Sequence, residues 1–412
     1  MRFKIHKRNA LIFVLVALIA LCVVIRIRKN DNVHQEINKD VASPASATSK
    51  FQYDTVFNMK KSVYGSNYRQ FIHNADKFSA DPQLVVVVQV HKRPAYLKLL
   101  VDSLEKVLGV HNILLIFSQD YFSEEIASEI ERIDFCRVLQ IYFPYSTQLY
   151  PAEFPGQDPK DCPRDISKDS AIKMNCNNAD YPDSYGHYRE SAFTQAKHHW
   201  WWKLHFVWER VRVLQGYTGY VLFIEEDNYL LPDFYHVFEG MAALKKKECP
   251  DCDMLALGNH DDATRFEEFA DKVETSGWLS TRHNIGMAMP KEMYYKLMGC
   301  NAEFCTYDDY NWDWTLQHLS GSCISKPLKV LAAKSSRVLH TGNCGLHHNQ
   351  GCQPEVARQG VKGLLDLSQK FLFPSSLIVN SQQPVEHKNH MINGGWGDIR
   401  DHVLCKNYAN IL

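Results

Sequence analysis

An apolar run that ends in three acidic residues constrains this chain more than any other feature. Tyr220 to Ile224 form the apolar run, and Glu225, Glu226 and Asp227 follow it directly. The pattern predicts a buried strand whose carboxyl end projects carboxylates into a cleft, the edge at which open α/β sheets bind ligands. A hard divalent cation such as Mg²⁺ or Mn²⁺ would relieve the repulsion between these carboxylates. A solvated acidic turn is an equally good reading of this stretch alone.

Strands and helices alternate after residue 80, which predicts an α/β fold. Leu84–Val90 is a β-branched run typical of a parallel strand buried on both faces, and Pro94 opens a helix with an apolar face. Further elements are expected as strands at 112–117, 136–143 and 253–257 and helices at 123–133, 197–215 and 232–247. Such βαβ units give a mostly parallel sheet flanked by helices. The chain contains neither GxGxxG nor a P-loop motif, which excludes an ordinary dinucleotide-binding domain and a P-loop enzyme.

The N-terminus predicts a retained membrane anchor. Four basic residues precede an uninterrupted apolar run over 10–25, and three follow it. The run is shorter than the ~20 residues that span an average bilayer, but flanking basic side chains can snorkel to the interface. A cleaved signal peptide is the alternative, and the residues at 21–25 form a poor cleavage site. We expect a cytoplasmic tail (1–9), a signal-anchor helix (10–25), a largely disordered luminal stem (26–80) and a luminal folded domain (81–412).

Cysteine usage agrees with an oxidising lumen. Eleven of the twelve cysteines follow the predicted anchor, which is rare in cytosolic enzymes. Cys136 begins an apolar strand and is expected to be the unpaired thiol. Short spacing favours the disulfides Cys162–Cys176, Cys249–Cys252 and Cys344–Cys352. Short loop closure favours Cys300–Cys323, which leaves Cys305 to pair with Cys405. A zinc site at Cys249 and Cys252 is less favoured, because no second CxxC is present.

Composition narrows the class of partner. The net charge is −1, and no concentrated basic patch occurs beyond the N-terminus, so nucleic acid is not an expected partner. Hydrophobic residues make up 45% of the chain, which is enough for a sizeable core.

Three groups of polar residues are expected to meet at one edge of the sheet. His91, Lys92 and Arg93 follow the first strand, Asp120 follows the second, and the acidic triplet at 225–227 follows a later one. Positive groups for phosphates, a carboxylate for a ribose or base, and a cation cluster together predict a nucleotide-sugar site. Each group alone has an ordinary alternative, such as a helix cap for Asp120.

Several long motifs occur in order along the chain. They are Val87–Pro94, Phe154–Asp165, Tyr181–Glu190, Lys197–Arg210, Glu225–Asp227, Phe304–Thr315 and Gly394–His402. Together they resemble the N-acetylglucosaminyltransferase II family from about residue 80 to the end. The resemblance implies a GT-A glycosyltransferase fold with a Rossmann-like sheet and a disulfide-stapled C-terminal part. It also implies a Golgi membrane enzyme of N-glycan biosynthesis, with Mn²⁺ as cofactor.

The resemblance also assigns roles to individual residues. Asp227 and His340 would hold Mn²⁺. Asp313 would be the catalytic base, with Asp308 and Asp309 as rivals, and the neighbouring Trp312 and Trp314 suit a sugar-binding wall. Donor contacts would come from Gln89, Val90, His91, Lys92, Arg93, Asp120, Gln195, Ala196, Lys197, His198, His199, Glu225 and Glu226. Acceptor contacts would come from Arg164, Asp183, Asn284, Tyr310 and Trp312.

The implied reaction moves GlcNAc from UDP-GlcNAc to O2 of the alpha-1,6-linked mannose of an N-glycan on a glycoprotein, with inversion. This step commits hybrid N-glycans to the complex type. Transfer to the alpha-1,3 arm is one alternative, and only the motifs at 154–190 and 304–315 favour the alpha-1,6 arm. A luminal glycan-binding protein without turnover is the other, and such a protein needs none of Asp227, His340 and Asp313.

Overall fold

The computed structural model describes residues 45–411, apart from 262–263, 346–350 and 385–390. The predicted cytoplasmic tail and signal anchor therefore lie outside the described residues. Within the described ranges, no helix combines the length and apolar character needed to cross a bilayer. The chain divides into two compact units, Met1–Asn58 and Met59–Leu412.

The segment predicted to be a disordered stem is ordered in part. Ala45–Arg69 forms helix α2, and Ile72–His73 forms strand β1. The Asn67 side-chain amide donates to the Tyr142 carbonyl oxygen at 2.6 Å, and its oxygen accepts from the Tyr142 main-chain nitrogen at 2.8 Å. The polar composition of the segment did not reveal this contact, because its partner lies 75 positions away. The folded unit therefore begins at Met59 rather than at residue 81.

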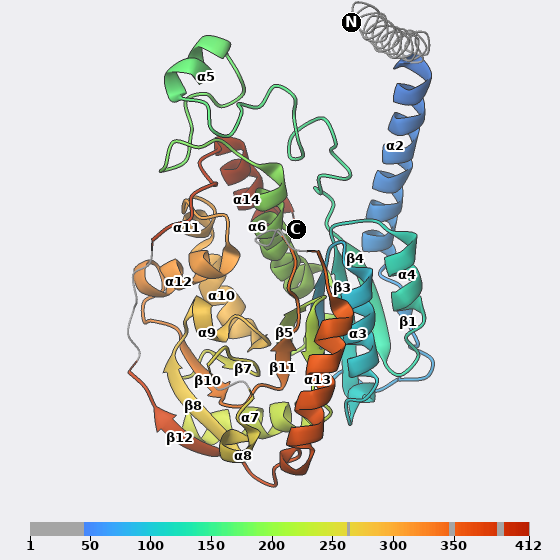
Figure 1. The fold of residues 1–412 in the computed structure, drawn as a ribbon, viewed down its shortest axis with the longest axis vertical. Coiled ribbons are helices and arrows are strands. Elements are labelled where there is room, and N and C mark those ends of the chain that lie inside the picture. Colours follow the sequence, from blue (N-terminus) through green and yellow to red (C-terminus); the bar gives the residue numbers. More distant parts are fainter. Residues whose placement is uncertain (1–44, 262–263, 346–350, 385–390, 412) are drawn as a thin grey trace, which may run out of the picture. The chain divides into compact units, whose positions relative to one another are not determined.

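A ten-stranded mixed sheet is the centre of the second unit among the described residues (Figure 1). Its order is β1-β4-β3-β2-β5-β9-β7-β10-β8-β12. The bounds are β2 Leu84–Val90, β3 Ile113–Gln119, β4 Arg137–Tyr142, β5 Tyr220–Glu225, β7 Met254–Ala256, β8 Lys272–Gly277, β9 Met287–Met289, β10 Lys329–Ala333 and β12 Ile378–Gln382. Strands β4, β3, β2 and β5 are parallel, whereas β9 is antiparallel to both neighbours. A separate pair joins β6 (Asn228–Leu230) to β11 (Val338–His340).

The β-branched strand β2 is buried on both faces, as its sequence predicts. Val85 and Val87 enter a core that contains the tryptophans of helix α6, whereas Val86 and Val88 enter a second core on the opposite face. All four side chains are inaccessible to solvent. This alternation follows from the period of two along a strand and confirms the predicted α/β class.

Helices flank the sheet (Figure 1). Their bounds are α3 Pro94–Leu104, α4 Glu124–Glu131, α5 Lys168–Met174, α6 Ser191–His205, α7 Phe234–Glu248, α8 Phe266–Phe269, α9 Ser280–His283, α10 Lys291–Gly299, α11 Asn301–Phe304, α12 Trp312–Ser322, α13 Pro354–Ser368 and α14 Ile399–Ile411. The prediction of one helix over 197–215 is wrong at both ends, because helix α6 spans Ser191–His205. Helix α6 begins earlier and gives way to a π turn at Phe206–Arg210 and a short 3₁₀ turn.

Five disulfides pair the cysteines as expected. The bonds are Cys162–Cys176, Cys249–Cys252, Cys300–Cys323, Cys305–Cys405 and Cys344–Cys352. Among the described cysteines, Cys136 alone is free, and it is buried. The second of these bonds contradicts the zinc alternative, because it leaves no thiolate at either position to bind a metal.

Candidate active site

The carboxyl ends of β2, β3 and β5 meet at one edge of the sheet. Gln89 on β2 lies beside Ser118 of β3 and Glu225 of β5 in the strand register. A cavity of about 670 Å³ opens at this edge. Fourteen of the predicted site residues line it: Gln89, His91, Lys92, Arg93, Asp120, Gln195, Ala196, Glu225, Asp227, Asn284, Tyr310, Trp312, Asp313 and His340.

Asp227 and His340 are brought together by the small β6–β11 pair. The register places His340 opposite Asn228, and His340 Nε2 lies 3.3 Å from Asp227 Oδ2. Gly342 allows this approach, because a Cβ atom there would lie only 1.9 Å from Asp227 Oδ2. The sequence predicted the two residues as partners only through the family resemblance, since they are far apart along the chain.

The Asp227 carboxylate has one oxygen occupied and one free. Oδ2 accepts from Arg93 Nη1 at 2.6 Å, whereas Oδ1 is buried with no hydrogen-bond partner among the described residues. Burial alone would raise the pKa of Asp227, but His340 and Arg93 lower it. The hydrogen bond to Asp227 raises the pKa of His340. A buried acceptor oxygen beside an imidazole suits a divalent cation, whose binding would release the imidazole proton.

The two glutamates of the triplet differ from each other. Glu226 is buried and accepts from the His91 main-chain nitrogen at 2.8 Å and from Arg93 Nε at 2.7 Å. It therefore fixes the basic loop after β2 and does not belong to the described cavity wall. Glu225 lines the cavity and lies near Lys203, whose Nζ donates to Gln89 Oε1 at 2.5 Å.

Asp120 lies between two histidines. Its oxygens are 2.5 Å from His91 Nδ1 and 3.2 Å from His199 Nδ1. Burial alone would raise the pKa of Asp120, but the two imidazoles hold it well below its usual range. His199 in turn lies 2.8 Å from Ser118 Oγ, so it supports Asp120 from behind rather than forming part of the described cavity wall. Val90 contributes through its carbonyl oxygen, which accepts from the Asp120 main-chain nitrogen at 3.2 Å.

The opposite wall of the cavity is built by the start of α12. Trp312 stacks on Trp200 with ring centroids 4.4 Å apart and planes 6° from parallel. Asp313 follows it and accepts a hydrogen bond from Asn284 Nδ2 at 2.9 Å. Trp314, expected as a second part of the sugar-binding wall, is not among the described lining residues.

Several predicted contact residues are engaged elsewhere in the fold. Lys197 is buried, and its Nζ donates to the carbonyl oxygens of Tyr307 and Asp309 at 3.1 and 2.8 Å. Burial lowers the pKa of Lys197 to about 7. Asp183 accepts from the main-chain nitrogens of Tyr185, His187 and Gly395. Lys197 therefore ties helix α6 to the loop at 307–309, and Asp183 ties the turn at 183–187 to Gly395.

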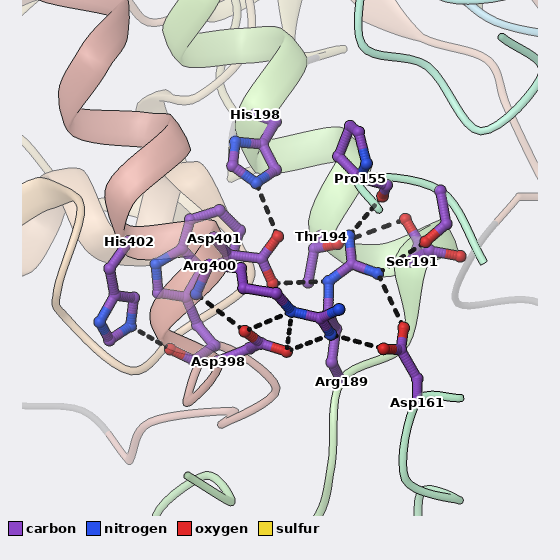
Figure 2. Close-up of polar contacts among 12 residues, drawn as sticks. Pro155, Asp161, Arg189, Ser191, Thr194, His198, Asp398, Arg400, Asp401 and His402 are labelled. Carbon is purple, nitrogen blue, oxygen red and sulfur yellow. Dashed lines mark hydrogen bonds and ion pairs between the residues drawn. The ribbon is translucent and has the colours of Figure 1, made fainter. Parts of the chain in front are cut away.

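His198 belongs to a buried ionic network (Figure 2). Its Nε2 lies 2.9 Å from Asp401 Oδ1, and Arg189 Nε donates to Asp401 Oδ2 at 2.7 Å. Arg189 Nη1 also donates to the Gly156 carbonyl oxygen at 2.9 Å. A second arginine, Arg400, pairs with acidic residues of the same cluster. The network joins the loop before α6 to α6 and α14.

Arg164 lies outside this network. It is exposed, pairs with Glu190 at 2.9 Å, and is absent from the described cavity wall. Its predicted acceptor contact stays a prediction.

Sequence reasoning missed several residues of the cavity wall, among them Trp200, Lys203 and His260. Lys203 follows Gln195 and His199 at intervals of four, so all three share one face of α6. That spacing was available in the sequence. His260 carries no comparable local signal, because it enters the site from the segment after β7.

Comparisons with known proteins show the family of this chain. A family model described as N-acetylglucosaminyltransferase II matches residues 60–405. The rat protein named alpha-1,6-mannosyl-glycoprotein 2-beta-N-acetylglucosaminyltransferase is 47% identical over 443 residues, which cover 100% of both chains. The human protein of that name is 46% identical over 448 residues, again with 100% of both covered. The Arabidopsis thaliana protein of that name is 33% identical over 82% of this chain and 78% of its own. This chain belongs to the N-acetylglucosaminyltransferase II family.

Proposed function

We propose that this chain transfers N-acetylglucosamine from UDP-GlcNAc to O2 of the alpha-1,6-linked mannose of N-glycans, forming a β1,2 bond. The observation that carries the proposal is the full-length match to relatives named for this activity, at 46–47% identity. The cavity supports it, because Asp227, His340 and Asp313 all line one space large enough for a nucleotide sugar. The enzyme is therefore a UDP-GlcNAc-dependent glycosyltransferase of N-glycan synthesis.

The donor end of the site would be formed by the edge of the parallel strands. Lys92 and Arg93 supply positive charge for the diphosphate, and the ionised Asp120 is a hydrogen-bond acceptor for the ribose or the base. Gln195 is held by its own oxygen, which accepts from the Thr147 main-chain nitrogen at 2.6 Å. Among the described residues, no hydrogen bond uses its amide nitrogen, which is therefore available to a ligand in the cavity.

Asp227 and His340 are the residues that would hold Mn²⁺. Within the described ranges, no group of three or more His, Cys, Asp and Glu side chains could hold a metal ion, so the donor diphosphate would complete the coordination. When bound, the ion neutralises charge that develops on the departing nucleoside diphosphate. Such a leaving group is already a weak base, so the site needs no general acid.

Asp313 would act as the general base on the opposite side of the reacting carbon. The acceptor hydroxyl O2 attacks the anomeric carbon of GlcNAc and gives its proton to the Asp313 carboxylate. The bond from the anomeric carbon to the phosphate oxygen breaks, and UDP leaves with the electron pair. A single displacement of this kind inverts an α-linked donor into a β-linked product.

The proposal includes a membrane-bound location. The apolar run over 10–25 and its basic flanks support a single-pass type II anchor in the Golgi membrane. Five disulfides fit a folded unit in an oxidising lumen. In sealed Golgi vesicles, a C-terminal tag should resist protease until detergent is added. Digestion of the tag without detergent would overturn this topology.

The choice of arm is tested with two acceptors. One offers a free alpha-1,6-linked mannose and the other a free alpha-1,3-linked mannose, each with UDP-GlcNAc and Mn²⁺. We expect transfer to the first acceptor to be at least about tenfold faster. A site whose polar groups hydrogen-bond one acceptor discriminates against another acceptor that leaves those groups unpaired. Faster transfer to the second acceptor would favour the alternative activity, transfer to the alpha-1,3 arm. Binding of acceptor without release of UDP would favour a glycan-binding protein.

A further inference from the structure

The Asp313 carboxylate is held at both oxygens. Oδ2 accepts from Ser280 Oγ at 2.8 Å and from Asn284 Nδ2 at 2.9 Å. Oδ1 accepts from the main-chain nitrogen of Trp314 at 3.0 Å. Rotation of the side chain would break these contacts, so Asp313 has one supported orientation.

Ser280 reaches Asp313 from outside the described cavity wall. Its residue is 1% exposed and lies at the start of α9. Its main-chain nitrogen donates to Gln317 Oε1 at 2.9 Å, and Gln317 lies one turn after Asp313 on α12. The start of α9 therefore contacts α12 at two successive turns.

The turn that carries Ser280 is itself fixed by His283. The His283 Nδ1 accepts from the Leu279 main-chain nitrogen at 3.1 Å, and its carbonyl oxygen accepts from Trp278 Nε1 at 3.3 Å. Burial lowers the pKa of His283 to about 3, so the ring stays neutral and keeps this acceptor. The turn that carries the Ser280 hydroxyl is thus held by hydrogen bonds to His283 and Gln317.

Asn284 differs from Ser280 in its access to ligand. Asn284 lines the cavity, and its Oδ1 lies 3.0 Å from His260 Nε2. It can contact a bound acceptor as well as Asp313. Among the described residues, the Ser280 hydroxyl donates a hydrogen bond to Asp313 alone, so removing it can separate orientation of the base from substrate binding.

We propose that Ser280 is a positioning residue for the transfer reaction, whose hydroxyl holds Asp313 in the orientation that receives the acceptor proton. The inference rests on the proposed function, because it takes Asp313 as the base. A general base contributes fully only when its oxygen is within hydrogen-bond reach of the proton. Residues locked by a supporting hydrogen bond meet this condition, whereas a free carboxylate spends time in other rotamers.

The first test compares Ser280→Ala with a matched control. Ser280→Ala should lower kcat roughly 10- to 100-fold, while KM for both substrates stays within about twofold. Ser280→Thr keeps the hydroxyl and should retain most of kcat. Ser335→Ala is the control, because it removes a buried hydroxyl that donates to the Arg265 carbonyl oxygen at 3.1 Å outside the described wall of the cavity. A Ser280→Ala enzyme with unchanged kcat would overturn the inference.

The second test is a double-mutant cycle with Asp313→Asn. If Ser280 acts through Asp313, adding Ser280→Ala to Asp313→Asn should lower the residual turnover by less than about twofold. An equal loss in both backgrounds would mean a general structural role and would overturn the inference. Thermal unfolding of each variant separates loss of fold from loss of turnover.

The two proposals fail in distinguishable ways. A wild-type chain that transfers no GlcNAc, or an Asp313→Asn variant with normal turnover, overturns the base assignment and this inference together. A wild-type chain that transfers, with turnover lost in Asp313→Asn but kept in Ser280→Ala, overturns only this inference.

Discussion

Asp227 and Asp313 line the same cavity, but their carboxylates have different surroundings. Asp227 keeps one buried oxygen without a partner among the described residues, which suits a cation. Asp313 has both oxygens held by neutral donors and lies beside the stacked Trp312. At the scale of single residues, this difference is the basis for assigning one to the metal and the other to the proton.

The base assignment predicts the effect of Asp313→Asn. Turnover should fall by roughly 10²–10⁴-fold, because the amide cannot accept the acceptor proton. UDP affinity in the presence of Mn²⁺ should change by less than about twofold, since the donor edge is intact. Steady-state kinetics and calorimetric titration with UDP measure the two quantities. Asp366→Asn, on the exposed face of α13, is the matched control.

The metal assignment predicts that a chelator lowers the affinity of the enzyme for UDP. In the wild-type enzyme, EDTA should weaken UDP binding by about tenfold or more, because the diphosphate loses its shared cation. In Asp227→Ala, UDP binding should be weak both with and without EDTA. Titration with UDP in Mn²⁺ and in EDTA gives this comparison. A UDP affinity that changes neither with EDTA nor with Asp227→Ala would contradict the metal assignment.

At the scale of elements, the loop before α6 depends on a buried ionic network (Figure 2). Asp401 on α14 binds Arg189 of the loop and His198 of α6. Burial alone would raise the pKa of Asp401, but Arg189 and His198 lower it to about 2, below the ordinary 3.8. The ionised carboxylate therefore stabilises the fold above about pH 4 and loses this effect as the pH falls toward 2.

This network predicts a pH-dependent cost for Asp401→Asn. The free energy of unfolding at pH 7 should fall by roughly 3 kcal/mol, because the buried Arg189 loses its nearer charged partner and keeps only Asp161 at 3.8 Å among the described carboxylates. The difference from wild type should narrow as the pH falls from about 4 toward 2. Urea unfolding at several pH values measures it. Asp165→Asn is the control, since its ion pair with Arg164 is exposed and should contribute about 1 kcal/mol or less. A constant difference at all pH values would contradict the assignment.

The strands and helices in the first half of the fold could be predicted from the sequence, because their bounds follow from local patterns of apolar residues. Strand β2 has the predicted bounds, because a continuous β-branched run is typical of a parallel strand that is buried on both faces. The antiparallel β9 could not be predicted, because its insertion between β5 and β7 depends on pairing with distant strands. The contact of His340 with Asp227 has the same origin, since the β6–β11 pair joins segments about 110 residues apart. Local patterns indicated the nucleotide-sugar edge of the sheet and a cation at the acidic triplet. Only the family resemblance selected Asp227 within the triplet, its partner His340 and the acceptor residues.

At the scale of the whole molecule, the Cys305–Cys405 disulfide ties the C-terminal helix to the segment that precedes α12. It closes 100 positions of chain, whereas Cys249–Cys252 closes three. The segment that leads into the α12 part of the cavity wall is therefore tied to the far end of the sequence.

Loop length predicts unequal costs for these two disulfides. Replacing both Cys305 and Cys405 by Ser should lower the free energy of unfolding by about 4–5 kcal/mol, and the same change at Cys249 and Cys252 by only about 1.5–2 kcal/mol. Urea unfolding of the two double variants measures both costs. Equal losses would contradict the chain-entropy argument.

We propose that the residues of one cavity catalyse transfer of GlcNAc to O2 of the alpha-1,6-linked mannose, with inversion at the anomeric carbon. The most direct measurement incubates the purified full-length chain in detergent with UDP-GlcNAc, Mn²⁺ and an N-glycan whose alpha-1,6-linked mannose is free, followed by NMR analysis of the product. We predict a single added GlcNAc in the β configuration, linked to O2 of that mannose. An α-linked product, addition at another hydroxyl or on the other arm, or release of UDP without transfer would contradict the account.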